Sequence, residues 1–144
     1  NRIQEAENKF LDFPGFENIK KRFIGHLQSN KVNKCLKNFD TIDSVDSLKL
    51  AKKLNNALKI KNGKIECLIE INTSGEIQKY GFQPKITDEL LSCFKLKQLS
   101  VVGLMTIGPN TKNESKKRNA FILLRNLRDD LNTKTGFQKN NKRI

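Results

Sequence analysis

The sequence predicts an α/β fold in which about four parallel strands alternate with helices. Four short apolar runs recur along the chain, and a helical spacing of apolar residues follows each run. The connections are short, so each helix carries the chain back and the next strand starts in the same direction as the last. The length of 144 residues suits one domain. These patterns leave open whether the sheet is an open, doubly wound one or part of a closed barrel.

The N-terminal part predicts a helix, a turn, a strand and a second helix. Residues 3–10 have the apolar spacing of a short helix, and Pro14 with Gly15 ends it in a turn. Residues 22–25 form an apolar run that stops at a glycine, which predicts the first strand. The chain then enters a helical pattern at residues 32–36.

The second unit starts with a brief strand at residues 39–42. Asp43 and Ser44 follow it, and we expect these polar residues to cap the next helix. That helix carries its apolar residues at helical spacing, namely Leu48, Ala51, Leu54 and Leu58.

The third and fourth units are predicted in the same way. Residues 65–72 are rich in β-branched residues and form the best strand pattern of the chain. A polar loop at residues 73–82 follows, and Pro84 at a first helical position predicts the helix with Ile86, Leu90, Cys93 and Phe94. Residues 99–105 predict the fourth strand and residues 106–109 a tight loop. The apolar stripe of the last helix consists of Ala120, Phe121, Leu124, Leu127 and Leu131, and Gly136 can end that helix.

The chain is strongly basic, with 28 Lys and Arg residues against 15 Asp and Glu residues and a formal net charge of +13. Lysine supplies nearly all of this charge, whereas bidentate recognition of phosphate and guanine favours arginine. The lysines are spread over every segment, as a compositional bias would also spread them. We therefore expect no nucleic-acid partner. A basic module that binds polyanions, with the KNNKR stretch at 139–143, is the alternative function.

Several other classes of protein are disfavoured by the composition. The cysteines Cys35, Cys67 and Cys93 are widely spaced without a CxxC pattern, and His26 is the lone histidine, so neither a disulfide framework nor a metal site is expected. The cysteines are predicted to be reduced core residues. The sequence has no apolar run of the roughly 18–20 residues that a membrane span needs, and no signal-peptide pattern at its start. We expect a cytoplasmic protein without a membrane partner.

Candidate site residues lie where the predicted strands end, since ligands bind there in both α/β architectures. Asn72 could hold a ligand through its amide or cap a turn. His26 could take part in proton transfer or serve the structure. Lys79 could bind a phosphate, form an imine or be a solvated surface lysine. Met105 could wall a flat ring or pack in the core.

No nucleotide or hydrolase motif accompanies these residues. The chain contains neither GxGxxG nor GxxxxGK followed by Ser or Thr, and it has no GxSxG. Residue patterns alone therefore predict a ligand-binding α/β chain and no particular reaction.

Five segments resemble, in the right order, motifs of the pyridoxal phosphate homeostasis protein family. FIGHLQSNK at 23–31 is similar to the family signature F-I-G-x-L-Q-x-N-K. DTIDS at 40–44, INTSGE with KYGF at 71–82 and VGLMTI at 102–107 resemble three further motifs, and NRIQEA at 1–6 is similar to the segment that follows the family's GEN motif. The resemblance covers about residues 1–131.

The resemblance implies a (β/α)8 barrel of the alanine-racemase-like type, here about four of its parallel strands with their helices. It also implies binding of pyridoxal 5′-phosphate (PLP) and a role in intracellular PLP (vitamin B6) homeostasis without an established reaction. By the matched motifs, Asn1, Asn72 and Met105 are expected on the wall that faces the cofactor, and His26, Gln28 and Lys79 are further candidates. No catalytic residue and no metal are implied. Racemase-like activity is not expected, because the racemases add a second domain and a catalytic tyrosine.

The resemblance also implies that parts of the family's cofactor site are missing. The family's Schiff-base lysine precedes the segment matched at 1–6, and its phosphate-binding segments should follow Gly136, where this chain reads FQKNNKRI. We therefore expect one incomplete barrel domain over 1–144, a truncated or split form with a basic polar tail at 137–144 that can be disordered. Such a part of a barrel exposes strand edges and an inner face, so a complementing barrel segment or self-association is expected.

Overall fold

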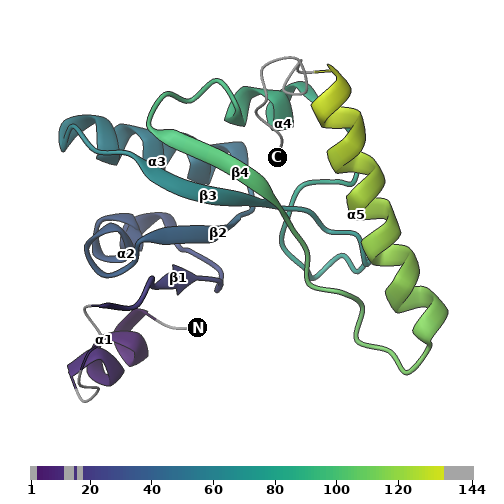
Figure 1. The fold of residues 1–144 in the computed structure, drawn as a ribbon, viewed down its shortest axis with the longest axis horizontal. Helices are drawn as coiled ribbons and strands as arrows, with labels where there is room; N and C mark the ends of the chain where they lie inside the picture. The colour runs from purple at the N-terminus through teal and green to yellow at the C-terminus, as the bar shows by residue number, and fades with distance from the viewer. Residues whose placement is uncertain (1–2, 12–14, 16–17, 135–144) are drawn as a thin grey trace.

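The computed structural model describes residues 3–11, 15 and 18–134, and its core is a four-stranded sheet. The strands are in the order β1-β2-β3-β4, and all three neighbouring pairs are parallel (Figure 1). The prediction of an α/β fold with four parallel strands is confirmed. The elements are α1 (Ile3–Leu11), β1 (Arg22–Phe23), the 3-10 helix η2 (Ser29–Lys31), α2 (Val32–Asn38), β2 (Thr41–Val45), α3 (Leu48–Ile60), β3 (Ile65–Glu70), α4 (Asp88–Cys93), β4 (Leu99–Met105) and α5 (Glu114–Lys134).

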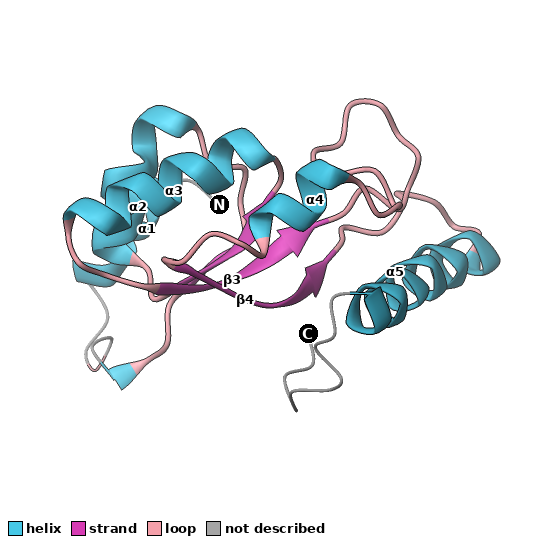
Figure 2. Cartoon of the chain, turned by 90° about the horizontal axis from the view of Figure 1, so that it is seen from above, coloured by secondary structure: helices cyan, strands magenta, loops and turns pink. Residues whose placement is uncertain are grey.

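The two faces of the sheet differ in chemistry. Helices α2, α3 and α4 lie on one face (Figure 2), where Ile42 of β2 stands beside Cys67 of β3 and both are fully buried. Side chains alternate between the faces of a strand, so the preceding pair, Thr41 and Glu66, points to the other face. There Glu66 is exposed and binds Lys20, with 2.6 Å between Nζ and Oε2. The core therefore lies between the sheet and one layer of helices.

An ion pair between β1 and β2 lies next to this polar face. The Arg22 guanidinium donates to both carboxylate oxygens of Asp43, at 2.7 and 3.0 Å. Asp43 is buried, and Ser44 donates a hydrogen bond to the carbonyl oxygen of Gly25. Both residues lie inside β2, so the expectation that they cap the next helix is wrong. The cap is Ser47, whose hydroxyl accepts from the backbone N–H of Leu50.

Two further expectations about the helices are corrected. Pro84 does not open a helix, because α4 begins at Asp88 with Thr87 as its N-cap. Phe121 does not join the buried stripe of α5, since 55% of it is exposed. Figures 1 and 2 place α5 to one side, at the end of the sheet where β4 finishes, which leaves part of its apolar surface uncovered.

The three cysteines are core residues, as predicted: Cys35, Cys67 and Cys93 are free and buried.

None of the helices in the described part of the chain is long and apolar enough to cross a membrane. Asn1, Gly136 and the tail at 137–144 lie outside the described residues.

Candidate functional site

The carboxyl ends of the parallel strands bring distant parts of the sequence together. His26 follows β1, Asp46 follows β2, Asn72 follows β3, and Met105 ends β4. Parallel strands end at the same edge of a sheet, so these side chains come to one place although the sequence separates them widely. Thr73 and Thr106 tie the last two strand ends together through their hydroxyl oxygens, 2.8 Å apart.

His26 is held between a carboxylate and an aromatic ring. Its Nδ1 lies 2.8 Å from Oδ2 of Asp46, whose side chain is only 7% exposed. The imidazole also stacks on Tyr80, with ring centroids 3.7 Å apart and ring planes 11° apart. The two contacts fix both the position and the plane of the imidazole. The rings cover each other's inner faces, and Tyr80 remains half-exposed beside the strand ends.

Tyr80 reaches His26 because Asn72 folds the loop that follows β3. The Asn72 amide nitrogen donates to the carbonyl oxygens of Glu76 at 2.8 Å and Lys79 at 3.2 Å, and its Oδ1 accepts from the Ser74 hydroxyl. The amide of Asn72 is thus engaged in shaping this turn.

The end of the loop is pinned to β3 at Gly81. The φ angle of Gly81 is +115°, and a Cβ at this position would lie 2.8 Å from the backbone nitrogen of Asn72. The next residue, Phe82, donates its backbone N–H to the carbonyl oxygen of Glu70 at 2.8 Å. A glycine is therefore required for the loop to return so close to the strand.

Lys79 is bound within the loop and is not a solvated surface lysine. Its ammonium lies 2.8 Å from Oε1 of Glu76 and donates to the carbonyl oxygen of Gly108 at 2.8 Å. The side chain is 22% exposed. The contact between Lys79 and Glu76 lowers the pKa of the Glu76 carboxyl, chiefly because the Lys79 ammonium donates a hydrogen bond to it. The positive charge of Lys79 is thus already compensated.

A pocket of about 140 Å³ lies between the end of β3 and this loop. Residues 70–72, 78–80 and Ile107 line it. Glu70, the last residue of β3, is 6% exposed and contributes its carboxyl group to the lining. Burial raises the pKa of Glu70, the nearby Asp46 charge raises it further, and His26 acts in the opposite direction.

The remaining predicted site residues are spread more widely. Gln28 is exposed and lies in the segment between β1 and α2, away from the pocket lining. Met105 is partly buried and pairs with Glu70 across β3 and β4. Asn1 lies outside the described residues. Thus His26, Asn72 and Met105 lie at or directly after the strand ends, Asn72 and Lys79 line the pocket, and Gln28 is an exposed residue that does not line it.

Sequence reasoning missed three residues of this site. The strand-end rule does not point to Glu70 or Asp46, and the sequence marks Tyr80 only as the lone tyrosine. The alternation of Glu66, Leu68 and Glu70 along an apolar strand is a signal for Glu70, because it places two acidic residues on the face opposite the core. The stacking of Tyr80 on His26 joins residues 54 positions apart and has no local signal.

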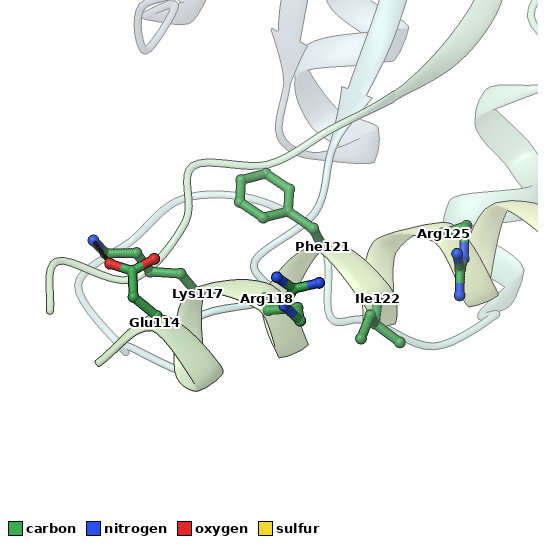
Figure 3. A pocket seen from close by; sticks show the side chains of 6 residues that line it. All are labelled: Glu114, Lys117, Arg118, Phe121, Ile122 and Arg125. Atoms are coloured by element: carbon green, nitrogen blue, oxygen red, sulfur yellow. Dashed lines mark hydrogen bonds and ion pairs between the residues drawn. The ribbon is translucent and has the colours of Figure 1, made fainter. Parts of the chain in front are cut away.

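A second surface feature is a groove along α5. It has a volume of about 480 Å³ and is lined along one stripe of the helix by Glu114, Lys117, Arg118, Phe121, Ile122 and Arg125 (Figure 3). Glu114 binds Lys117, with 2.7 Å between Oε1 and Nζ. Arg118 and Arg125 form no ion pair with another described residue. The groove therefore combines apolar surface with uncompensated positive charge.

Metal ligands do not gather anywhere in the part of the chain that the structure describes. No group of three or more His, Cys, Asp or Glu side chains there could hold a metal ion. The strand-end site combines an aromatic stack, an imidazole held by the buried carboxylate of Asp46, amide and ammonium groups, and the buried carboxyl group of Glu70.

Comparison with known sequences finds relatives over most of the chain. A family model described as the alanine racemase N-terminal domain matches residues 5–140. The pyridoxal phosphate homeostasis protein of Bos taurus is 40% identical over 125 residues, which are 82% of this chain and 46% of that protein. The protein of the same name from Aquifex aeolicus (strain VF5) is 36% identical over 132 residues, 91% of this chain and 58% of its own. The chain spans about half the length of these relatives.

Solved structures with a similar fold include PipY of Synechococcus elongatus PCC7942. The structure of PipY without PLP matches with a TM-score of 0.84 and 28% identity over 93% of this chain and 63% of PipY. PipY with PLP bound matches with a TM-score of 0.77 and 27% identity over 93% of this chain and 62% of PipY. Alanine racemase of Clostridium difficile 630 has a TM-score of 0.71 at 21% identity, over 90% of this chain and 36% of the racemase, which shows a shared fold.

Proposed function

The chain belongs to the family of the alanine racemase N-terminal domain, and we propose that it binds PLP and acts in vitamin B6 homeostasis. The similarity that the motifs predicted is confirmed, and so is the predicted fold of the alanine-racemase-like type with four parallel strands. The observation that carries the proposal is the 40% identity, over most of this chain, to a protein named for pyridoxal phosphate homeostasis. The likeness to PipY, whose structure has PLP bound, supports it.

The described residues fit one side of such a cofactor. An outer face of the His26–Tyr80 stack is a flat surface of the kind on which a pyridine ring stacks. Met105 and Asn72 stand at the neighbouring strand ends. The pocket of about 140 Å³ is smaller than the roughly 300 Å³ or more of a pocket that holds a whole ligand, and Glu70 would repel a phosphate group. We therefore propose that this chain contributes one wall of the site and that the phosphate group lies outside this pocket.

We further propose binding without turnover. PLP, when bound, supplies an aldehyde that reacts with primary amines. The relatives are named for homeostasis of the cofactor and not for a reaction. In this chain, His26 would orient the ring surface through its bond to Asp46, and Asn72 would hold the loop that carries Tyr80.

Titration with PLP tests the proposal. We expect a saturable change in the visible absorbance of the cofactor, accompanied by a change in the fluorescence of Tyr80, the single tyrosine of a chain without tryptophan. Borohydride reduction and peptide mapping then show whether a lysine carries the cofactor. Lys79→Gln is compared with Lys85→Gln, which removes an exposed lysine near the loop. A titration that leaves both signals unchanged at every concentration contradicts the proposal.

A second candidate function is the binding of polyanions, and the α5 groove favours it. Arg118 and Arg125 flank Phe121 there, a combination of cationic and aromatic side chains that binds single-stranded nucleic acids in other proteins. Affinity for an oligonucleotide should then fall steeply with salt, and Arg118→Gln together with Arg125→Gln should reduce the slope. An affinity that does not change with salt excludes this function.

A further inference from the structure

The carboxyl group of Glu70 has no hydrogen-bond or ion-pair partner among the residues that the structure describes. Glu70 is only 6% exposed, and it lines the pocket between β3 and the loop 73–82. No hydrogen bond or ion pair joins its carboxylate to another residue of the described part of the chain. Buried carboxylates are normally paired, because transfer of an unpaired charge from water is costly. Its lack of a partner inside a pocket points to a ligand that supplies one.

The other charged side chain of the lining is paired. The Lys79 ammonium lies 2.8 Å from Oε1 of Glu76, which compensates its charge. Glu70 is thus the acidic side chain of the lining without a partner among the described residues, and the Asp46 charge nearby raises its pKa further. The pocket thus has the electrostatics of a cation site, although the chain as a whole is strongly basic.

The walls of the pocket favour an organic cation over a metal ion. Ile71, Ile107 and the ring of Tyr80 provide apolar and aromatic surface. The Oδ1 of Asn72 is already engaged by the Ser74 hydroxyl, so few oxygen atoms are free to coordinate a metal. An ammonium group can bind the carboxylate, and its alkyl part can contact the isoleucines and the aromatic ring.

The volume limits the size of the ligand. About 140 Å³ holds roughly four or five groups of the size of a water molecule, each of which takes about 30 Å³ in the liquid. A primary amine with two or three carbon atoms fills such a space.

We propose that the pocket between β3 and the loop 73–82 binds the ammonium group of a small primary amine, with Glu70 as its counter-ion. Asn72 and Tyr80 shape the opening, and the isoleucines contact the alkyl chain. The site shares Asn72 and Tyr80 with the proposed cofactor wall, but its charge and its size come from residues of this chain, so it can be tested without PLP.

The experiment titrates the full chain with propylammonium chloride in the absence of PLP. Tyrosine fluorescence reports on Tyr80, and the backbone amide NMR signals of Asn72 and Gln78 report on the pocket wall. Propan-1-ol matches the alkyl chain without the charge, and NaCl matches the ionic strength. Physiological ionic strength is used, because a screening length of about 8 Å weakens repulsion from distant lysines.

We expect saturable changes with propylammonium and none with propan-1-ol or NaCl. Glu70→Gln should raise the Kd at least about tenfold, because it keeps the shape of the side chain and removes its charge. The matched control, Glu5→Gln, removes an exposed carboxylate on α1 and should leave the Kd unchanged.

Three results would overturn the proposal. The first is an unchanged Kd in Glu70→Gln, and the second is an equal response to propan-1-ol. The third is the absence of any response to propylammonium in both fluorescence and NMR. None of these results bears on PLP binding, which is measured separately by cofactor absorbance.

Discussion

The imidazole of His26 lies flat against the phenol ring of Tyr80, with 3.7 Å between the ring centroids. This contact joins the end of β1 to the loop that follows β3. It holds the loop against the strand ends while Asp46 fixes the imidazole from the edge. The position of the pocket wall thus depends on a pair of aromatic rings.

Replacement of Tyr80 by leucine should release this contact. Loss of an aromatic pair costs about 0.5–1.5 kcal/mol, and the exposure of Tyr80 places the expected loss at the lower end. The ring current on His26 disappears with the phenol, so the imidazole C–H signals should move downfield in the NMR spectrum. His26 is the single histidine, so these signals are assigned directly. Tyr80→Phe keeps the ring and should keep the shifts; equal spectra for the leucine variant and the wild type would contradict the stacking.

Substitution of Gly81 by alanine should displace the loop. A Cβ there would lie 2.8 Å from the backbone nitrogen of Asn72, and the φ of +115° is strained for any L side chain. Backbone strain of this kind costs about 1–3 kcal/mol, and the close contact adds to it. Urea unfolding measures the loss, and the NMR signals of His26 show whether Tyr80 has moved.

Gly75→Ala is the matched control for that substitution. Gly75 also has a positive φ, of +72°, yet a Cβ there meets nothing within 4 Å. It should cost about 1 kcal/mol and leave the His26 signals in place. If the two variants lose equal stability, the close approach of the loop to β3 has no energetic importance.

Neutralisation of Glu70 should stabilise the chain at neutral pH. The pKa of Glu70 is raised in the folded state by burial, with Asp46 adding to the rise and His26 opposing it. Folding therefore takes up a proton, and the stability this provides is full at pH values below the ordinary pKa of 4.5 and is lost as the pH rises through the raised pKa. Glu70→Gln avoids this loss of stability. The loss is about 1.4 kcal/mol for each unit by which the pKa in the folded chain exceeds the ordinary value.

Urea unfolding at a series of pH values checks this prediction. The curves of wild type and Glu70→Gln should converge at acidic pH and separate toward neutral pH, with the variant more stable. Lys79 and Glu76, which also lie near the pocket, are present in both proteins and do not affect the difference. A variant less stable than wild type at neutral pH would show that the ionised carboxyl is stabilised by a partner.

The buried thiols should make the fold sensitive to alkali. Burial raises the pKa of Cys35, Cys67 and Cys93 to about 12, from an ordinary value of 9.0. Above pH 9 the unfolded chain loses thiol protons that the folded chain keeps, so stability falls as the pH rises toward about 12. Each thiol contributes a slope of up to about 1.4 kcal/mol per pH unit.

The slope is measured by urea unfolding between neutral and alkaline pH. Cys93→Ala is less stable at every pH because it leaves a cavity, yet its slope should be smaller by the contribution of one thiol. Titration of the lysines affects both proteins alike. An identical slope in the two proteins would show that Cys93 ionises as readily in the folded chain as in the unfolded one.

The elements that rest on local patterns were predictable from the sequence. The strand at residues 99–105 has the bounds of β4, and the helix predicted at residues 3–10 differs from α1 by one residue. The role of Asp43 was predicted wrongly. Its carboxylate lies inside β2, where it pairs with Arg22 of β1, and this partner from another strand has no local signal in the sequence. Pro84 is compatible with a helix start, but Thr87 supplies the cap that fixes the start at α4.

The site was predictable only in part, because some of its contacts join residues that are distant in the sequence. The rule that ligands bind at strand ends found His26, Asn72, Lys79 and Met105. It could not predict the stacking of Tyr80 on His26, or the pocket into which the Glu70 carboxyl faces without a partner among the described residues. Both depend on how the loop 73–82 returns to β3. The tail at 137–144 and Asn1 lie outside the described residues, and the expected cytoplasmic location stays a prediction.

Within residues 18–134, the order β1-β2-β3-β4 means that each strand of the sheet pairs only with strands adjacent to it in the sequence. Every new strand therefore finds its partner already in place when it leaves the ribosome. The sheet can grow by one strand and one helix at a time, without waiting for a distant segment to be synthesised. Until the next strand arrives, the newest one offers its free backbone groups to any extended chain nearby, so the rate of translation sets how long each intermediate is open to aggregation.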